Sequence, residues 1–199
     1  IIYICSNRAI AEQNISRLNV FDDKDFSFSS RMTMVAKEVS QLRGNKVNFV
    51  SFTPGTSFDL KSTLGIADER VLLWHALRRM WGPELLDSDA ARRIFQGRLS
   101  SLARFDELAT WGNDWAKDLD AELLEMFRVE LDSTDLRERF ESLASRFHTA
   151  TPEPDALADQ NRVVGELRSR LAAQCVSALE PDLVILDEFQ RFRDLLGDD

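Results

Sequence analysis

The sequence predicts an α/β protein in which a parallel sheet carries a large all-α insertion. Three short apolar runs with strand character lie at 1–5, 47–53 and 183–187. Helical periodicity fills the segment between the first two runs and the much longer segment between the second and the third. Parallel strands need crossover connections, which are usually helices, so this order is typical of a parallel sheet. It divides the chain into a first sheet part at 1–65, a helical insertion at 66–158 and a second sheet part at 159–199.

The first and third apolar runs are nearly continuous, which favours strands that are covered on both faces. Two helices are expected between the first two strands. One begins near Ser6 and Asn7, and its apolar positions are Ala11, Ile15 and Leu18. The other follows a Ser29-Ser30 cap, ends at Gly44, and has the apolar positions Val35, Val39 and Leu42. This spacing is that of one buried helix face.

The segment from residue 67 to residue 180 shows helical spacing throughout. Its first four apolar stripes are Val71, Leu72, Ala76 and Met80; Ala91, Ile94, Phe95, Leu99 and Leu102, after a Ser88 cap; Leu119, Leu123, Leu124, Phe127 and Leu131; and Leu136, Phe140, Leu143 and Phe147, after Ser133 and Thr134. The Pro-rich stretch 151–155 interrupts the pattern. A long final helix then follows through Val164, Leu167, Leu171 and Cys175.

Composition indicates an ordinary globular protein, because 44% of the 199 residues are hydrophobic and 30% are charged. No apolar stretch reaches the roughly 20 residues of a membrane span, and no signal peptide is visible, so no membrane partner is expected. The net charge of −9 gives no overall basic footprint for nucleic acid. Cys5 and Cys175 fit buried free thiols in a reducing cytoplasm. A strand at residue 1 without an initiator Met indicates a fragment of a longer protein.

The strongest candidate site is the acidic pair that ends the third apolar run. Asp187 and Glu188 follow Leu183 to Leu186 directly. In parallel sheets, ligands bind at the carboxyl ends of the strands. The first acid of such a pair can hold Mg²⁺ through water, and the second can polarise an attacking water. The alternative is that both acids merely end a strand and begin a turn.

The run from Leu186 to Phe192 resembles motif II, the Walker B element, of superfamily-two helicases and Swi/Snf-like remodelling ATPases. The resemblance implies part of a RecA-like P-loop NTPase domain that uses ATP and Mg²⁺. Asp187 would hold Mg²⁺, Glu188 would be the catalytic base, and both would contribute to the nucleotide site. Gln190 would couple the nucleotide state to the second motor domain. Superfamily one also uses Asp-Glu-x-Gln, so motif II leaves the superfamily open.

Two upstream loops agree with this resemblance in order and position. Ser6, Asn7 and Arg8 follow the first strand and resemble motif Ia. Thr53, Pro54, Gly55 and Thr56 follow the second strand and resemble motif Ib. Hydroxyls, an amide and backbone N–H groups at strand ends suit the phosphates of a nucleic-acid strand. Taken singly, each loop is also an ordinary cap or turn.

The resemblance covers about 1–60 and 160–195 and implies a nucleic-acid-dependent helicase or translocase, with DNA preferred to RNA. The chain lacks a Gly-x-x-x-x-Gly-Lys-Ser/Thr phosphate loop. That loop and the second motor domain would have to come from the rest of the protein, so the fragment alone is not expected to hydrolyse ATP efficiently. A signalling or defence ATPase without nucleic acid and a non-enzymatic helical interaction module remain alternatives.

The remaining polar and aromatic residues are weaker candidates. His75 and His148 have no partner at metal-binding spacing. The arginines are expected on solvated faces beside acids: Arg78, Arg79, Arg92, Arg93, Arg168 and Arg170. The tryptophans are expected to pack in helices: Trp74, Trp81, Trp111 and Trp115. Within the insertion, the stretch from Trp111 to Trp115 has the most exposed character.

Overall fold

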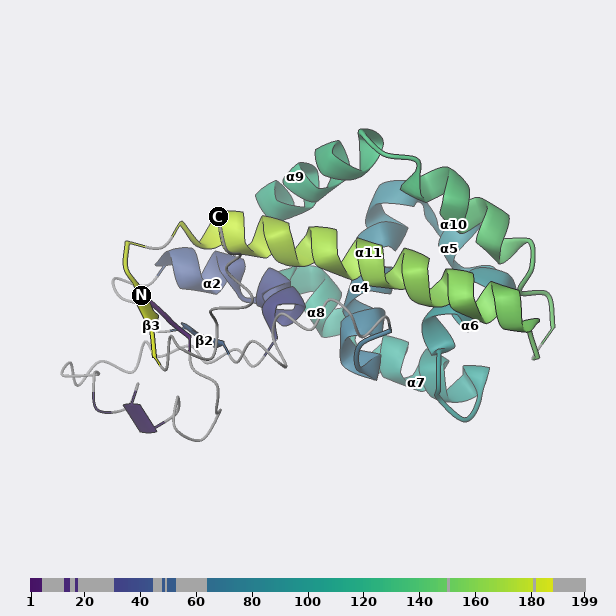
Figure 1. Ribbon diagram of the computed structural model, residues 1–199, viewed down its shortest axis with the longest axis horizontal. Coiled ribbons are helices and arrows are strands. Elements are labelled where there is room, and N and C mark those ends of the chain that lie inside the picture. Colours follow the sequence, from purple (N-terminus) through teal and green to yellow (C-terminus); the bar gives the residue numbers. More distant parts are fainter. Residues whose placement is uncertain are drawn as a thin grey trace, which may run out of the picture.

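The structure, a computed structural model, describes residues 1–4, 13–14, 17, 31–44, 48, 50–52, 64–149, 151–180 and 182–187 (Figure 1). The first elements are β1 (Ile2–Ile4), the 3₁₀ helix η1 (Met32–Lys37), α2 (Val39–Gly44) and β2 (Val50–Phe52). The following helices are α4 (Ala67–Trp81), α5 (Pro83–Leu86), α6 (Asp89–Gln96), α7 (Leu102–Trp111), α8 (Asn113–Asp118), α9 (Ala121–Asp132), α10 (Leu136–Ala144) and α11 (Pro154–Leu179). The last element is β3 (Val184–Leu186).

The predicted α/β fold class is wrong, because the described part of the chain is nearly all helical. Within that part, β-structure is limited to three strands of three residues each. The helices between β2 and β3 do not act as a crossover over a large sheet. They pack against one another and against η1 and α2 around one core, so the feature predicted as an insertion dominates the described fold.

The three short strands nevertheless pair as the sequence predicted. Their order is β2-β1-β3, and both pairings are parallel. β3 lies at an edge of this small sheet, and Val184 in it is 47% exposed. Leu183 and Leu186 are exposed as well. The expectation of a third strand covered on both faces is therefore wrong, because continuous apolar character does not by itself ensure a covering layer.

The helix expected after Ser29 and Ser30 is divided into η1 and α2. Arg31, not a serine, precedes η1, and both serines lie outside the described residues. The apolar positions are buried as predicted: Val35, Val39 and Leu42. The positions Ala11, Ile15 and Leu18 of the first expected helix lie outside the described residues.

The stripe predicted from Ala91 to Leu102 belongs to two helices. Ser88 caps α6 as predicted, since its hydroxyl accepts the Ala91 N–H at 3.2 Å. Gly97, with φ of +56°, ends α6 in a conformation that favours glycine. Ser101 then caps α7 by accepting the Arg104 N–H at 3.1 Å. The apolar residues from Ala91 to Leu102 follow one helical periodicity in the sequence, but Gly97 and the Ser101 cap divide them between two helices.

Helix α11 organises the helical part of the molecule. Its 26 residues correspond to about 39 Å at 1.5 Å per residue. It begins at Pro154, as the Pro-rich break predicts, and packs against η1, α2, α4, α9 and α10 (Figure 1). Its buried apolar side chains include Val164, Leu167, Leu171 and Cys175. The proposed domain boundary at 158/159 falls inside this unbroken helix. The helix ends at Leu179, and β3 is the next element of the described chain.

Candidate functional site

The ends of the three strands form one edge of the sheet, here called the strand-end edge. Ile4 at the end of β1 is in register with Phe52 of β2 and with Leu186 of β3. Because the strands are parallel and in register, their carboxyl ends lie at the same level and point in the same direction. The residues that follow these ends carry the three predicted motifs, so the structure brings the starting points of the motifs together.

Asp187 is the predicted site residue that the structure describes. It follows β3 directly and is half-buried. The Asn14 side-chain amide donates a hydrogen bond from Nδ2 to Asp187 Oδ2 at 3.2 Å. A bond across 173 positions in the sequence ties this carboxylate to the segment after β1. Asn14 was not predicted as a site residue, because its spacing from the motifs carries no signal.

The other predicted residues lie outside the described part of the chain. They are Ser6, Asn7, Arg8, Thr53, Pro54, Gly55, Thr56, Glu188 and Gln190. Cys5 lies outside it too, whereas Cys175 is a buried free thiol. The structure therefore establishes the strand ends and the position of Asp187, and the roles of the other residues stay predictions.

A buried charged cluster, missed by the sequence reasoning, joins η1, α4 and α11. Glu69 is 2% exposed and Arg168 is 3% exposed, and their side chains are 2.8 Å apart between Oε1 and Nη2. Thr33 Oγ1 donates to Glu69 Oε1 at 2.6 Å, and Arg31 Nη1 lies 3.0 Å from Glu69 Oε2. Burial alone would raise the pKa of Glu69, but the hydrogen bonds from Arg168 and Thr33 hold it below its usual range.

The expectation that Arg168 sits on a solvated face is therefore wrong. The signal was present in the sequence: residue 168 shares one helix face with Val164, Leu167 and Leu171, so it occupies a core position. Gly65 packs against the same cluster with φ of +63°, and a Cβ there would lie 2.4 Å from Arg168 Nε. Tight packing around a buried ion pair marks this cluster as a structural joint rather than an open site.

A second candidate is an open cleft of about 440 Å³ between α4, α6 and α7. His75, at its buried wall, lies with Nε2 2.9 Å from the Ala109 carbonyl oxygen. A carbonyl only accepts, so Nε2 carries the hydrogen, and burial lowers the pKa of His75. Arg78 pairs with Asp87, and Arg92 pairs with Asp106. The cleft is thus lined by charges that neutralise one another.

Three tryptophans pack as predicted and one does not. Trp74 and Trp81 are buried, and Trp115 packs partly against the core. Trp111 is 70% exposed, with the Arg104 guanidinium 5.9 Å from its ring centroid. The expectation of exposure in this stretch is confirmed at Trp111.

Metal and membrane features can be assessed for the described residues. Among them, no group of three or more His, Cys, Asp or Glu side chains is placed to hold a metal ion. None of the helices they form has both the length and the apolar character of a membrane span.

Comparison of the chain with protein-family models, curated proteins and solved structures gives no match.

Proposed function

We propose that this chain is part of a nucleic-acid-dependent ATPase, a helicase or translocase that couples ATP hydrolysis to movement along a strand. The observation that carries the proposal is the in-register parallel alignment of β2, β1 and β3. The three segments that resemble motifs Ib, Ia and II begin at the ends of those strands. The parallel register brings these three starting points to one edge of the sheet, the edge at which parallel sheets bind their ligands.

Each residue has a defined role in this proposal. Asp187 holds Mg²⁺ through water, and Asn14 orients its carboxylate by donating to Oδ2. Glu188 polarises the attacking water, and Gln190 couples the nucleotide to a second motor domain. Ser6, Asn7, Arg8 and residues 53–56 hold the nucleic-acid strand, with DNA preferred to RNA. The phosphate loop that completes the ATP site belongs to another part of the protein, and the proposed location is cytoplasmic.

The test is the ATPase activity of the full-length protein carrying Glu188→Gln. Loss of the catalytic carboxylate should abolish hydrolysis while nucleotide binding remains. Glu107→Gln, which changes an exposed acid of α7 distant in sequence, is the matched control. Unchanged hydrolysis in Glu188→Gln would end the motor proposal. A different pair of results would favour a signalling or defence ATPase. In that case Glu188→Gln would lose hydrolysis, but neither DNA nor RNA would stimulate hydrolysis by the wild type.

A second candidate is a non-enzymatic helical interaction module. It is favoured by the helices between residues 64 and 180, which share one continuous core with η1 and α2. It is also favoured by exposed Trp111, since aromatic side chains dominate binding energy at interfaces. This candidate requires residues 31–180, which keep η1 and α2 in the shared core, to fold when expressed alone, with a cooperative melt by circular dichroism, and to retain partner binding. A fragment that melts without cooperativity would contradict it.

A further inference from the structure

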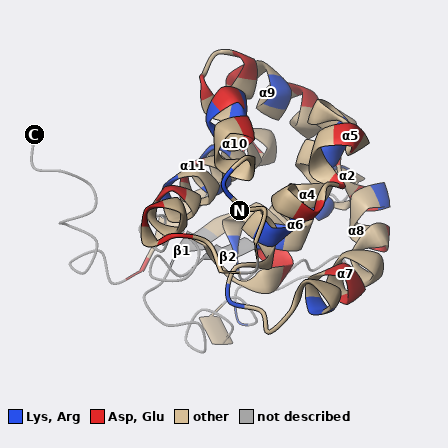
Figure 2. Cartoon of the chain, turned by 90° about the vertical axis from the view of Figure 1, so that its right-hand side faces the viewer, with Lys and Arg blue, Asp and Glu red and all other residues tan. Residues whose placement is uncertain are grey.

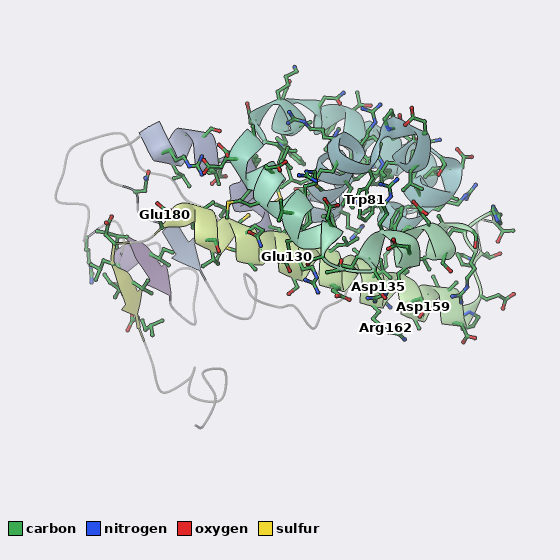
Figure 3. The ribbon with its side chains drawn as sticks, turned by 90° about the horizontal axis from the view of Figure 1, so that it is seen from above. Trp81, Glu130, Asp135, Asp159, Arg162 and Glu180 are labelled. Atoms are coloured by element: carbon green, nitrogen blue, oxygen red, sulfur yellow. The ribbon has the colours of Figure 1, made fainter. Side chains whose placement is uncertain are left out.

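A cleft between α10 and α11, here called the α10–α11 cleft, collects three arginines. Its rim is formed by Arg139, Ser142, Arg146, Asp159 and Arg162. Buried Leu143 and Val163 contribute its apolar wall. The residues recur at 139, 142, 143 and 146, and at 159, 162 and 163, which places each set on one helix face. Figure 3 shows Asp159 and Arg162 near each other at this cleft.

The charge of the cleft is opposite to that of the chain. Its lining holds three arginines and one acid, whereas the whole chain has a net charge of −9. The other large polar cleft, with Arg78, Asp87, Arg92 and Asp106, is balanced. Along the described helices, residues of both charges are interspersed (Figure 2). Arg139 pairs with acids outside the lining, so the local excess of positive charge is that of Arg146 and Arg162 over Asp159. Such an excess in a concave site favours a ligand with negative charge.

One carboxylate now serves two of these arginines. Arg146 Nη1 lies 2.5 Å from Asp159 Oδ2, and Arg162 Nη1 lies 3.0 Å from Asp159 Oδ1. Arg139 is fixed from the other side by Glu166 at 2.9 Å and by Asp135 at 3.4 Å. The hydrogen bond from Arg146 and the positive charges of Arg162 and Arg139 lower the pKa of Asp159. Asp159 thus lies between the guanidinium groups of Arg146 and Arg162.

We propose that the α10–α11 cleft binds a phosphate group, which replaces the Asp159 carboxylate between Arg146 and Arg162. A phosphate offers more acceptor oxygens and more charge than a carboxylate, and the guanidinium fork suits it. The cleft volume of about 200 Å³ is below the roughly 300–1,000 Å³ of ordinary small-molecule sites. It therefore fits a single phosphate, either free or in a nucleic-acid backbone, rather than a whole nucleotide.

The inference goes beyond the proposed ATPase function, and its test needs no ATP hydrolysis. If the source is a nucleic-acid strand, the cleft extends the strand contacts of the proposed motor onto the helices. A negative result here leaves the Glu188→Gln experiment untouched, and a loss of ATPase activity says nothing about this cleft.

The experiment measures binding of two probes to the 199-residue chain at low ionic strength, where phosphate contacts are strongest. One probe is a fluorescein-labelled oligothymidylate, followed by anisotropy, and the other is inorganic phosphate, followed by ³¹P NMR. Asp159→Asn removes the competing charge with little change of shape. It should tighten binding by about fivefold, the upper range for an exposed ion pair. Arg146→Gln and Arg162→Gln should weaken it by a similar factor.

Arg128→Gln on α9 is the matched control. Its guanidinium is about as exposed as that of Arg146 and pairs with Glu125 and Asp132. Circular dichroism melting checks that each variant is folded, and Arg162, at 69% side-chain exposure, can be replaced without disturbing the core. Changes seen with both probes indicate a site for free phosphate, and changes seen only with the oligonucleotide indicate a backbone contact. The proposal is overturned if neither probe binds or if Arg128→Gln weakens binding as much as the cleft variants.

Discussion

The helices between α4 and α11 and the three-stranded sheet are stabilised in different ways. The helices bury a continuous apolar core that includes Phe95, Phe127 and Phe140, and their ends are capped by Ser88, Ser101 and Asp120. The sheet has three residues per strand, and its third strand exposes Val184 and Leu186. The candidate chemistry lies at the sheet, whereas the packing that stabilises the fold lies in the helices. Substitutions in the helical core should therefore lower the free energy of unfolding, and substitutions at the sheet should lower ATP hydrolysis.

The largest expected effect separates the two regions by stability. Phe140 is fully buried, and its ring centroid lies 5.6 Å from that of Phe95 and 5.5 Å from that of Trp81. Phe140→Ala should lower the free energy of unfolding by about 3–5 kcal/mol. Val184→Ala, in the exposed edge strand, should change it by at most about 0.5 kcal/mol. Urea denaturation measures both, and equal losses would contradict the contrast.

The second prediction concerns the buried joint between α4 and α11. Arg168→Met leaves the Glu69 carboxylate buried without its closest ion-pair partner and should cost about 3 kcal/mol. Replacing Glu69 by Gln in the same chain removes that charge, so the double variant should be more stable than Arg168→Met alone. Urea denaturation of the two single variants and the double variant gives the coupling. Simple additivity of the two changes would show that the pair does not act as a unit.

The buried Glu69–Arg168 pair should make the stability of the protein depend on pH. The pKa of Glu69 is lowered in the folded state, so its contribution to stability is present above the ordinary value near 4.5 and is lost as the pH falls through the lowered value. Stability measured from neutral pH downward should fall less steeply in Glu69→Gln than in the wild type. Parallel curves would mean that other carboxylates account for the acid sensitivity.

A smaller effect is expected at the end of α6. Ser88→Ala removes the hydroxyl that accepts the Ala91 N–H and should cost about 1 kcal/mol. Ser88→Asp, which restores a capping oxygen, should recover most of that stability. Thermal melts of the two variants provide the comparison, and equal destabilisation would mean that the cap is not what stabilises this helix start.

Structural features that depend on a single local rule, such as capping or periodicity, were predicted correctly from the sequence. The Ser88 cap, the Pro-rich start of α11 and the buried positions Phe127 and Phe140 follow from capping and periodicity. The parallel pairing of the strands followed from their order along the chain.

Sequence reasoning failed where tertiary packing overrides the pattern. The α/β class was wrong, because strand character at three points does not reveal that each strand has only three residues. Arg168 was assigned to solvent by its charge, although its helix position placed it in the core. The hydrogen bond between Asn14 and Asp187 joins distant segments and leaves no signal in local spacing.

The most direct test of the central claim is one variant with two measurements. Asp187→Asn in the full-length protein should lower Mg²⁺-dependent ATP hydrolysis by roughly 100-fold or more, the usual cost of removing a group that stabilises developing charge. Because Asp187 follows a short edge strand outside the helical core, its free energy of unfolding should change by at most about 0.5 kcal/mol. Retained hydrolysis, or a loss that only accompanies unfolding, would contradict the assignment of chemistry to the sheet and stability to the helices.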